Sequence, residues 1–326
     1  MRYTPFLAEL FKKNRAKLYA QLPPKSIVVV SSNDIMPTNA DGTMGFRQNS
    51  DLFYLSGLDQ EETYLILYPD APEPQWREIA FVRETSELIE IWEGHKYTKE
   101  EATQTSGIKK IQWSSNFDSL LKTLVYSANH VYLTDNEHLR NASVVQTQNA
   151  RLGINIRNTY PNHAIGRLAP ILSDLRMQKE PEELQAMQVA CDITEKGFRR
   201  VLNFTKPGVT EYEIEAEFIH EFTRNRSEGF AYTPIIASGS NACVLHYMEN
   251  NQQCQDGDVI LLDVGAEYAN YASDLTRCLP VNGRFTARQK AVYNAVLHVK
   301  NEAQKLLVDD WHNEPWGWAK RQGFVK

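Results

Sequence analysis

The order of apolar and polar residues divides the chain into two stretches of different pattern. Up to about residue 170, short apolar runs of strand length alternate with segments of helical period. A helix is predicted after Pro5, a buried strand at Ile27 to Val30, and an aromatic-rich strand within Phe46 to Gly57. Alternation of this kind predicts an α/β domain.

Beyond residue 170 the pattern changes to long amphipathic helices. One helix begins at Pro181 and repeats apolar residues every three or four positions as far as Val201. Thr210 and Glu213 form a capping box that opens a second helix, and Thr286 with Gln289 opens a third. We therefore predict two domains, residues 1–172 and residues 173–326.

The second domain also contains a predicted hairpin with an aspartate on each strand. Val259 to Leu262 is typical of a buried strand, and Tyr271 to Leu279 predicts its partner. If the turn is centred between Tyr268 and Ala269, Asp263 lies directly opposite Asp274 and both side chains point to the same face.

Two like charges at such a position persist only if cations neutralise them or if one takes up a proton. A pair of divalent metal ions is therefore the more specific interpretation of Asp263 and Asp274. The structural alternative is that an aspartate following an apolar run caps a turn, as such residues commonly do.

Composition narrows the class of protein. With 42% hydrophobic and 23% charged residues, the chain is that of an ordinary globular protein and not of a disordered or fibrous one. A net charge of −6 gives no electrostatic case for nucleic acid. Four cysteines without CxxC spacing indicate neither a zinc knot nor a disulfide framework, which suits a reducing cytoplasm. No apolar run approaches the length of a membrane span, and no membrane partner is expected.

Taken together, the motifs resemble those of the pita-bread metallopeptidases, the fold shared by methionine aminopeptidase, prolidase, aminopeptidase P and creatinase. Within that group the chain is most similar to the aminopeptidase P family. The resemblance implies an α/β N-terminal domain of the aminopeptidase P and creatinase type, followed by an α+β pita-bread catalytic domain. The matching stretches are Phe46-Arg47-Gln48, Phe53-Tyr54-Leu55-Ser56-Gly57, Lys206-Pro207-Gly208, Ile236-Ala237-Ser238-Gly239, Leu245-His246-Tyr247, Asp263-Val264-Gly265-Ala266-Glu267-Tyr268 and Tyr271-Ala272-Ser273-Asp274-Leu275-Thr276-Arg277.

The resemblance implies a role for each site residue. Asp263 matches a ligand of one metal ion, and Asp274 matches a ligand that bridges two ions. His246 matches a histidine that faces the substrate and helps to stabilise the tetrahedral intermediate. Two divalent ions are implied, and manganese suits carboxylate ligands. The ions would lower the pKa of a shared water, making hydroxide available at neutral pH.

The implied activity is release of the N-terminal residue ahead of proline, so the expected partners are peptides with proline at the second position. Prolidase, which cleaves Xaa-Pro dipeptides, is the near alternative. Trp92 falls where relatives carry a tryptophan that reaches a neighbouring subunit, which implies a homo-oligomer formed through the N-terminal domain.

The chain departs from the family after Leu307. Relatives complete the metal site with one histidine and two glutamates that follow the second aspartate, whereas residues 309–326 form a divergent tail here. We therefore expect a C-terminally truncated catalytic domain, and a non-catalytic fragment is the leading alternative function. The pair His298 and Glu302 is expected to be a solvated helix face. No ligand role is assigned to His312 or Glu314.

Overall fold

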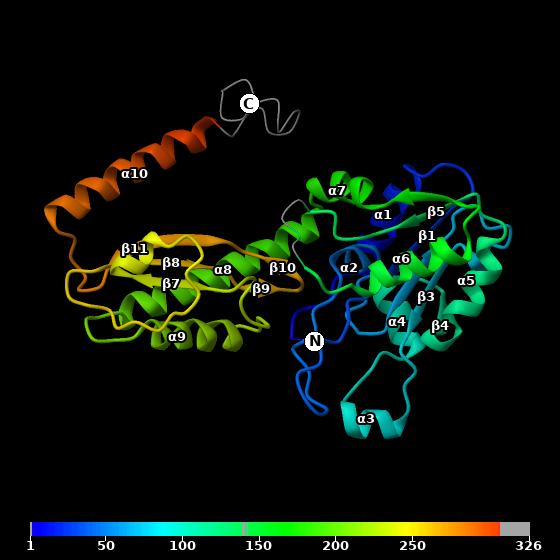
Figure 1. Ribbon diagram of the computed structural model, residues 1–326, viewed down its shortest axis with the longest axis horizontal. Coiled ribbons are helices and arrows are strands. Elements are labelled where there is room, and N and C mark those ends of the chain that lie inside the picture. Colours follow the sequence, from blue (N-terminus) through cyan, green and yellow to red (C-terminus); the bar gives the residue numbers. More distant parts are fainter. Residues whose placement is uncertain (1, 139–140, 142, 307–326) are drawn as a thin grey trace. The chain divides into compact units, whose positions relative to one another are not determined.

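A computed structural model describes residues 2–138, 141 and 143–306 (Figure 1). The chain divides into two compact units. Unit 1 comprises Met1–Ala190 together with Glu267–Ala272, and unit 2 comprises Cys191–Ala266 together with Ser273–Lys326. Helix α8 (Pro181–Phe204) begins in unit 1 and continues in unit 2.

Unit 1 is built on a mixed sheet of six strands in the order β4-β3-β2-β1-β5-β6. Strand β1 pairs antiparallel with β2 and parallel with β5. All six residues of β1 are buried, as expected for a central strand covered on both faces. The strands are β1 (Ser26–Ser31), β2 (Tyr64–Leu67), β3 (Glu78–Val82), β4 (Lys110–Trp113), β5 (His130–Leu133) and β6 (Ala164–Arg167).

Helices cover both faces of this sheet and give it two apolar cores. Val28 and Val30 of β1 belong to one core, and Ile27 and Val29 belong to the other, because side chains alternate across a strand. Helices α1, α2, α4 and α7 contribute to the first core, whereas α5 and α6 contribute to the second. The helices are α1 (Ala8–Tyr19), α2 (Ser50–Ser56), α3 (Glu87–Glu93), α4 (Lys99–Ser106), α5 (Phe117–Val125), α6 (Gln148–Thr159) and α7 (Ala169–Met177), with short 3₁₀ turns at Pro74–Trp76 and Ser114–Asn116.

Helix α2 lies where the sequence predicted an aromatic-rich strand, so that prediction is wrong. The side chain of Asn49 accepts hydrogen bonds from the N–H groups of Asp51 and Leu52, which caps the N-terminus of the helix. Gly57 ends the helix in the left-handed conformation, with φ of 69°. A run of seven residues is too short for hydrophobic periodicity to separate helix from strand.

Unit 2 contains an antiparallel sheet of three strands in the order β11-β8-β7. Its strands are β7 (Ile235–Ser238), β8 (Val259–Val264) and β11 (Leu275–Pro280), and its helices besides α8 are α9 (Glu211–Arg224) and α10 (Ala287–Leu306). Both predicted capping boxes are confirmed: the Thr210 N–H donates to Glu213 over 2.7 Å, and the Thr286 N–H donates to Gln289 over 2.8 Å.

The segment that leads to Leu245-His246-Tyr247 does not form a strand. A 3₁₀ turn, Gly239–Cys243, occupies the start of this segment, and His246 follows in a turn. Asn241 and Tyr247 hydrogen-bond to a buried carboxylate instead of to a neighbouring strand, so the segment does not extend.

The apolar face of α10 is largely uncovered by the described part of the chain. Three valines on this face are largely exposed: Val292 by 48%, Val296 by 64% and Val299 by 66%. Across residues 2–138, 141 and 143–306, no helix combines the length and apolar character needed to cross a membrane.

Candidate functional site

The two aspartates lie on neighbouring strands, but not in the predicted register. Asp263 of β8 pairs with Thr276 of β11, so Asp274 is displaced by two residues from direct opposition. The turn is centred between Ala269 and Asn270, which have φ values of 54° and 66°. A two-residue hairpin turn with positive φ at both positions matches the right-handed twist of its strands, and asparagine adopts that conformation readily.

A shift of two residues preserves the face to which a side chain points. Asp274 is therefore the diagonal neighbour of Asp263 on the same face of the ribbon. The Tyr232 hydroxyl lies 2.7 Å from Oδ1 of Asp263 and 3.1 Å from Oδ1 of Asp274, as donor to both. The carboxylates thus converge on one donor, although by a different register from the one predicted.

Electrostatics keep that donor protonated. Burial raises the pKa of Tyr232, and the hydrogen bonds and negative charges of Asp263 and Asp274 raise it further. Asp263 is half-buried and Asp274 is exposed, so the pair is open to solvent on one side. An O–H shared between two carboxylates offsets part of their mutual repulsion without neutralising either charge.

The backbones of Gly265 and Ser273 approach each other closely between the two aspartates. A Cβ atom at Gly265 would lie 1.8 Å from the carbonyl oxygen of Ser273, so only glycine fits there. The N–H of Ala266 donates to the hydroxyls of Thr194 and Ser273, each at 2.9 Å, and these hydroxyls are 2.6 Å apart. This close approach holds the backbone that precedes Asp274 against the backbone that follows Asp263.

The residues of the hairpin turn belong to unit 1 and contact other side chains of that unit. The rings of Tyr268 and Tyr3 pack edge to face with centroids 6.3 Å apart, and the rings of Tyr271 and Phe6 do so at 5.8 Å. The side-chain amide of Asn270 donates to Asp59 over 2.9 Å. These contacts fix the position of the turn. Because they involve residues far from the hairpin in the chain, the hairpin sequence alone does not reveal them.

His246 is exposed, and its position depends on Glu211. The Glu211 side chain is fully buried at the first position of α9. It accepts hydrogen bonds from the Ser238 N–H at 2.8 Å, the Asn241 amide at 3.2 Å, the Tyr247 hydroxyl at 2.7 Å and the Gln252 N–H at 2.9 Å. One carboxylate therefore fixes both ends of the loop that carries His246.

No hydrogen bond or ion pair between described residues joins His246 to Asp263 or Asp274, so its predicted role stays a prediction. Tyr247, its neighbour, donates a hydrogen bond to Glu211. Burial and the hydrogen bond to Glu211 raise the pKa of Tyr247 to about 12.

The donor set fits part of a metal centre. Two converging carboxylates suit hard or borderline divalent ions. Within the described residues, however, no group of three or more His, Cys, Asp or Glu side chains could hold an ion. His298 and Glu302 are 75% and 50% exposed and 4.0 Å apart, which confirms the predicted solvated pair. His312 and Glu314 lie outside the described residues.

Two site residues escaped the sequence analysis. Tyr232 lies in a loop, and only the register of the hairpin brings both aspartates to its hydroxyl. Glu211 has the sequence appearance of an ordinary acidic residue in the first turn of a helix.

Two protein-family models match the chain. Residues 11–132 match the model described as aminopeptidase P, N-terminal domain, and residues 185–312 match the model described as metallopeptidase family M24. Neither range reaches residue 172, so the domain boundary expected there stays a prediction.

Two curated relatives are about one third identical to this chain over the residues that match. The Xaa-Pro aminopeptidase of Haemophilus influenzae is 34% identical over 300 residues, which is 92% of this chain and 67% of the relative. The Xaa-Pro aminopeptidase of Escherichia coli is 32% identical over 298 residues, 91% of this chain and 67% of the relative. The chain thus spans about two thirds of the length of these relatives.

Solved structures agree with these matches. Pseudomonas aeruginosa aminopeptidase PepP has a TM-score of 0.84 and 28% identity, with 99% of this chain and 75% of that chain covered. Aminopeptidase P from E. coli with the inhibitor Pro-Leu has a TM-score of 0.78 and 30% identity, with 90% of this chain and 67% of that chain covered. These similarities confirm the expected fold class, an aminopeptidase P-type N-terminal domain followed by a pita-bread domain.

Replacement of Tyr232 tests the shared hydrogen bond. We expect Tyr232→Phe to lower the free energy of unfolding by about 1–2 kcal/mol at neutral pH, because two facing carboxylates lose their donor. Adding Asp274→Asn should recover part of the loss, since it removes one of the repelling charges. The measurement is urea unfolding followed by circular dichroism, with Tyr212→Phe, a substitution at a 56% exposed tyrosine of unit 2, as control. A loss no larger than that of the control would contradict the role of Tyr232.

Replacement of Tyr247 tests Glu211 through pH. A folded-state pKa of about 12, above the ordinary value of about 10, stabilises the fold below pH 10, and this contribution is lost as the pH rises through 12. We expect Tyr247→Phe to cost about 2 kcal/mol near pH 8, as for a hydrogen bond to a charged group. The gap between wild type and variant in urea unfolding should narrow between pH 10 and 12. A gap that widens there would refute the assignment.

Proposed function

The chain belongs to the aminopeptidase P family of M24 metallopeptidases, and on that premise we propose that it acts on peptides with proline at the second position, releasing the residue ahead of the proline. The observation that supports this most directly is the convergence of Asp263 and Asp274 on the Tyr232 hydroxyl. Paired carboxylates on adjacent strands are the part of a divalent-metal site that this hairpin can supply.

The proposal assigns Asp263 and Asp274 as metal ligands and His246 as the residue that faces the substrate carbonyl. Divalent metal ions, most simply Mn²⁺, polarise a carbonyl and lower the pKa of bound water. The chain's own residues would hold the ions, and Tyr232 would orient the carboxylates through its hydrogen bonds. The bond ahead of proline is a tertiary amide without an N–H, so peptidases that read that donor handle it poorly.

A second candidate function is a non-catalytic one. It is favoured by the absence, within the described residues, of any third His, Cys, Asp or Glu beside the two aspartates. Two carboxylates alone would hold an ion weakly. In this case the chain keeps the family fold and its subunit contacts but hydrolyses no peptide.

We place the activity in the cytoplasm, because the four cysteines are free, as is usual in a reducing compartment. We also propose a homo-oligomer formed through α3. No residue of this helix is buried, and Leu88, Ile91 and Trp92 are 64%, 78% and 80% exposed. Neighbouring exposed apolar side chains are typical of an interaction surface.

Peptide hydrolysis with and without Mn²⁺ separates the candidate functions. If the chain is an aminopeptidase, it should release the first residue of a tripeptide with proline second, and should leave the same tripeptide with alanine second intact. Prolidase activity would appear as cleavage of the Xaa-Pro dipeptide alone.

Asp274→Asn should abolish Mn²⁺ binding measured by electron paramagnetic resonance, because the remaining carboxylate cannot retain the ion.

The control for that substitution is Asp256→Asn, at an exposed aspartate of unit 2 outside the site. It should leave Mn²⁺ binding unchanged. Weak Mn²⁺ binding that depends on Asp274 but yields no cleavage would establish the non-catalytic candidate. Binding that survives Asp274→Asn would refute the metal assignment in both.

Substitution within α3 tests the oligomer. We expect Ile91→Glu to raise the dissociation constant of the oligomer by about tenfold or more, because burying a new charge in an apolar contact is unfavourable. Glu90→Gln on the same helix is the matched control and should change association little. Analytical ultracentrifugation over a concentration series provides the measurement, and a wild-type chain that stays monomeric throughout would rule the proposal out.

A further inference from the structure

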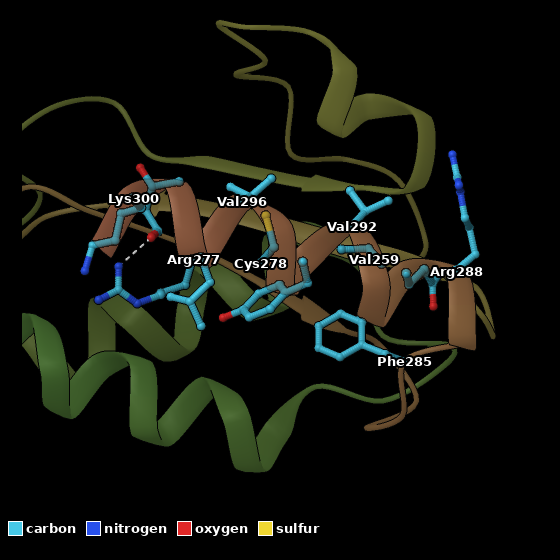
Figure 2. Close-up of a pocket in the computed structure, with 12 residues that line it drawn as sticks. Val259, Arg277, Cys278, Phe285, Arg288, Val292, Val296 and Lys300 are labelled. Atoms are coloured by element: carbon cyan, nitrogen blue, oxygen red, sulfur yellow. Dashed lines mark hydrogen bonds between the residues drawn. The ribbon is translucent and has the colours of Figure 1, made fainter. Parts of the chain in front are cut away.

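Unit 2 carries an apolar groove along α10 (Figure 2). It has a volume of about 540 Å³ and lies between this helix and the strands β8 and β11. Val259 of β8 and Cys278 of β11 form part of its wall, and Val292 and Val296 of α10 form another part. Neither Asp263 nor Asp274 lines the groove, although Thr276, the cross-strand partner of Asp263, does.

The groove exposes apolar side chains that the described residues leave uncovered. Val292 is 48% exposed, Val296 is 64% exposed and Leu297 is 41% exposed. Contiguous apolar surface of this kind on a helix normally packs against another segment or a partner. The helix itself is well anchored at its start, where the Gln289 amide donates to the carbonyl of Gly257 over 2.9 Å.

The charges along the groove are of one sign. Arg277 and Lys300 lie towards one end and Arg288 lies at the other (Figure 2). No acidic side chain is among the residues that line it in the described part of the chain. An occupant that fits must therefore be apolar along its length and negatively charged, and aromatic rings would gain further from contact with arginine and lysine.

We propose that this groove binds residues 308–318 of the same chain. These residues lie outside the described part of the chain, and their sequence supplies both properties that the groove requires. The stretch contains three tryptophans and three acidic residues and has no lysine or arginine: Trp311, Trp316, Trp318, Asp309, Asp310 and Glu314.

The lengths also match. At about 1.5 Å per residue, α10 places Val296 about 15 Å and Arg288 about 27 Å from Leu306. An extended chain covers about 3.3 Å per residue, so Trp311 can reach back about 17 Å and Trp318 about 40 Å. Residues 308–318 can therefore span the groove if they run antiparallel to the helix.

A second copy of this chain is the less favourable occupant. Two grooves facing each other would bring Arg277, Arg288 and Lys300 of one copy against those of the other, and like charges in contact are repulsive. Intramolecular binding also benefits from a high effective concentration, since the segment begins two residues beyond α10.

Disulfide trapping in the full chain tests the proposal. Cys278 already lines the groove, and Trp311→Cys places a second thiol on the segment, outside the described fold. The exposed Cys191 and Cys243 are replaced by serine. Oxidised glutathione should then yield a bond between positions 278 and 311 in the monomer, detected by mass spectrometry, because a disulfide requires Cα atoms within about 7 Å.

Charge substitutions supply the matched controls. Lys300→Glu should slow this cross-link about fivefold, and adding Asp309→Lys should restore it. Lys290→Glu makes the same change on an exposed residue of α10 that does not line the groove, and should leave the rate unchanged. The proposal fails if the bond does not form, if it forms only between two chains, or if Lys300→Glu and Lys290→Glu slow it equally.

Discussion

The repulsion between two carboxylates is the constraint on which the rest of unit 2 depends. Asp263 and Asp274 stand on the same face of one ribbon, and the Tyr232 hydroxyl donates a hydrogen bond to both. Such an arrangement is unfavourable unless donors or cations offset it. A fold that tolerates it must fix the backbone firmly, and Gly265, Thr194 and Ser273 do so by a close approach and shared hydrogen bonds.

Much of the fold could be predicted because its signals are local. The alternation of short helix-like and strand-like segments predicted the α/β fold of unit 1. The capping boxes at Thr210 and Thr286 predicted where two helices begin. Helix α2 was missed because its seven residues do not complete enough turns to show a period. Its decisive features, the Asn49 cap and the left-handed Gly57, are themselves local, and read together they were a signal for a helix rather than a strand.

The site was predictable only in its residue types. The sequence indicated that Asp263 and Asp274 belong together, and alternation along the strands ensured that an error of two residues kept them on one face. The register itself depends on contacts made by Tyr268, Tyr271 and Asn270 with residues far away in the chain. Tyr232 and Glu211 could not be found for the same reason, since their partners are remote in sequence.

The aspartate pair and the α10 groove of unit 2 suit ligands of opposite charge. The aspartate pair is negative and partly open to solvent, so it attracts cations. The α10 groove is apolar with a basic rim, so it attracts an acidic, aromatic segment and disfavours metal ions. An acidic segment bound along α10 would therefore contact basic side chains and would not compete with Asp263 and Asp274 for cations. It would instead reduce the net positive charge of α10. This helix has four basic side chains, Arg288, Lys290, Lys300 and Lys305, and one acidic side chain, Glu302.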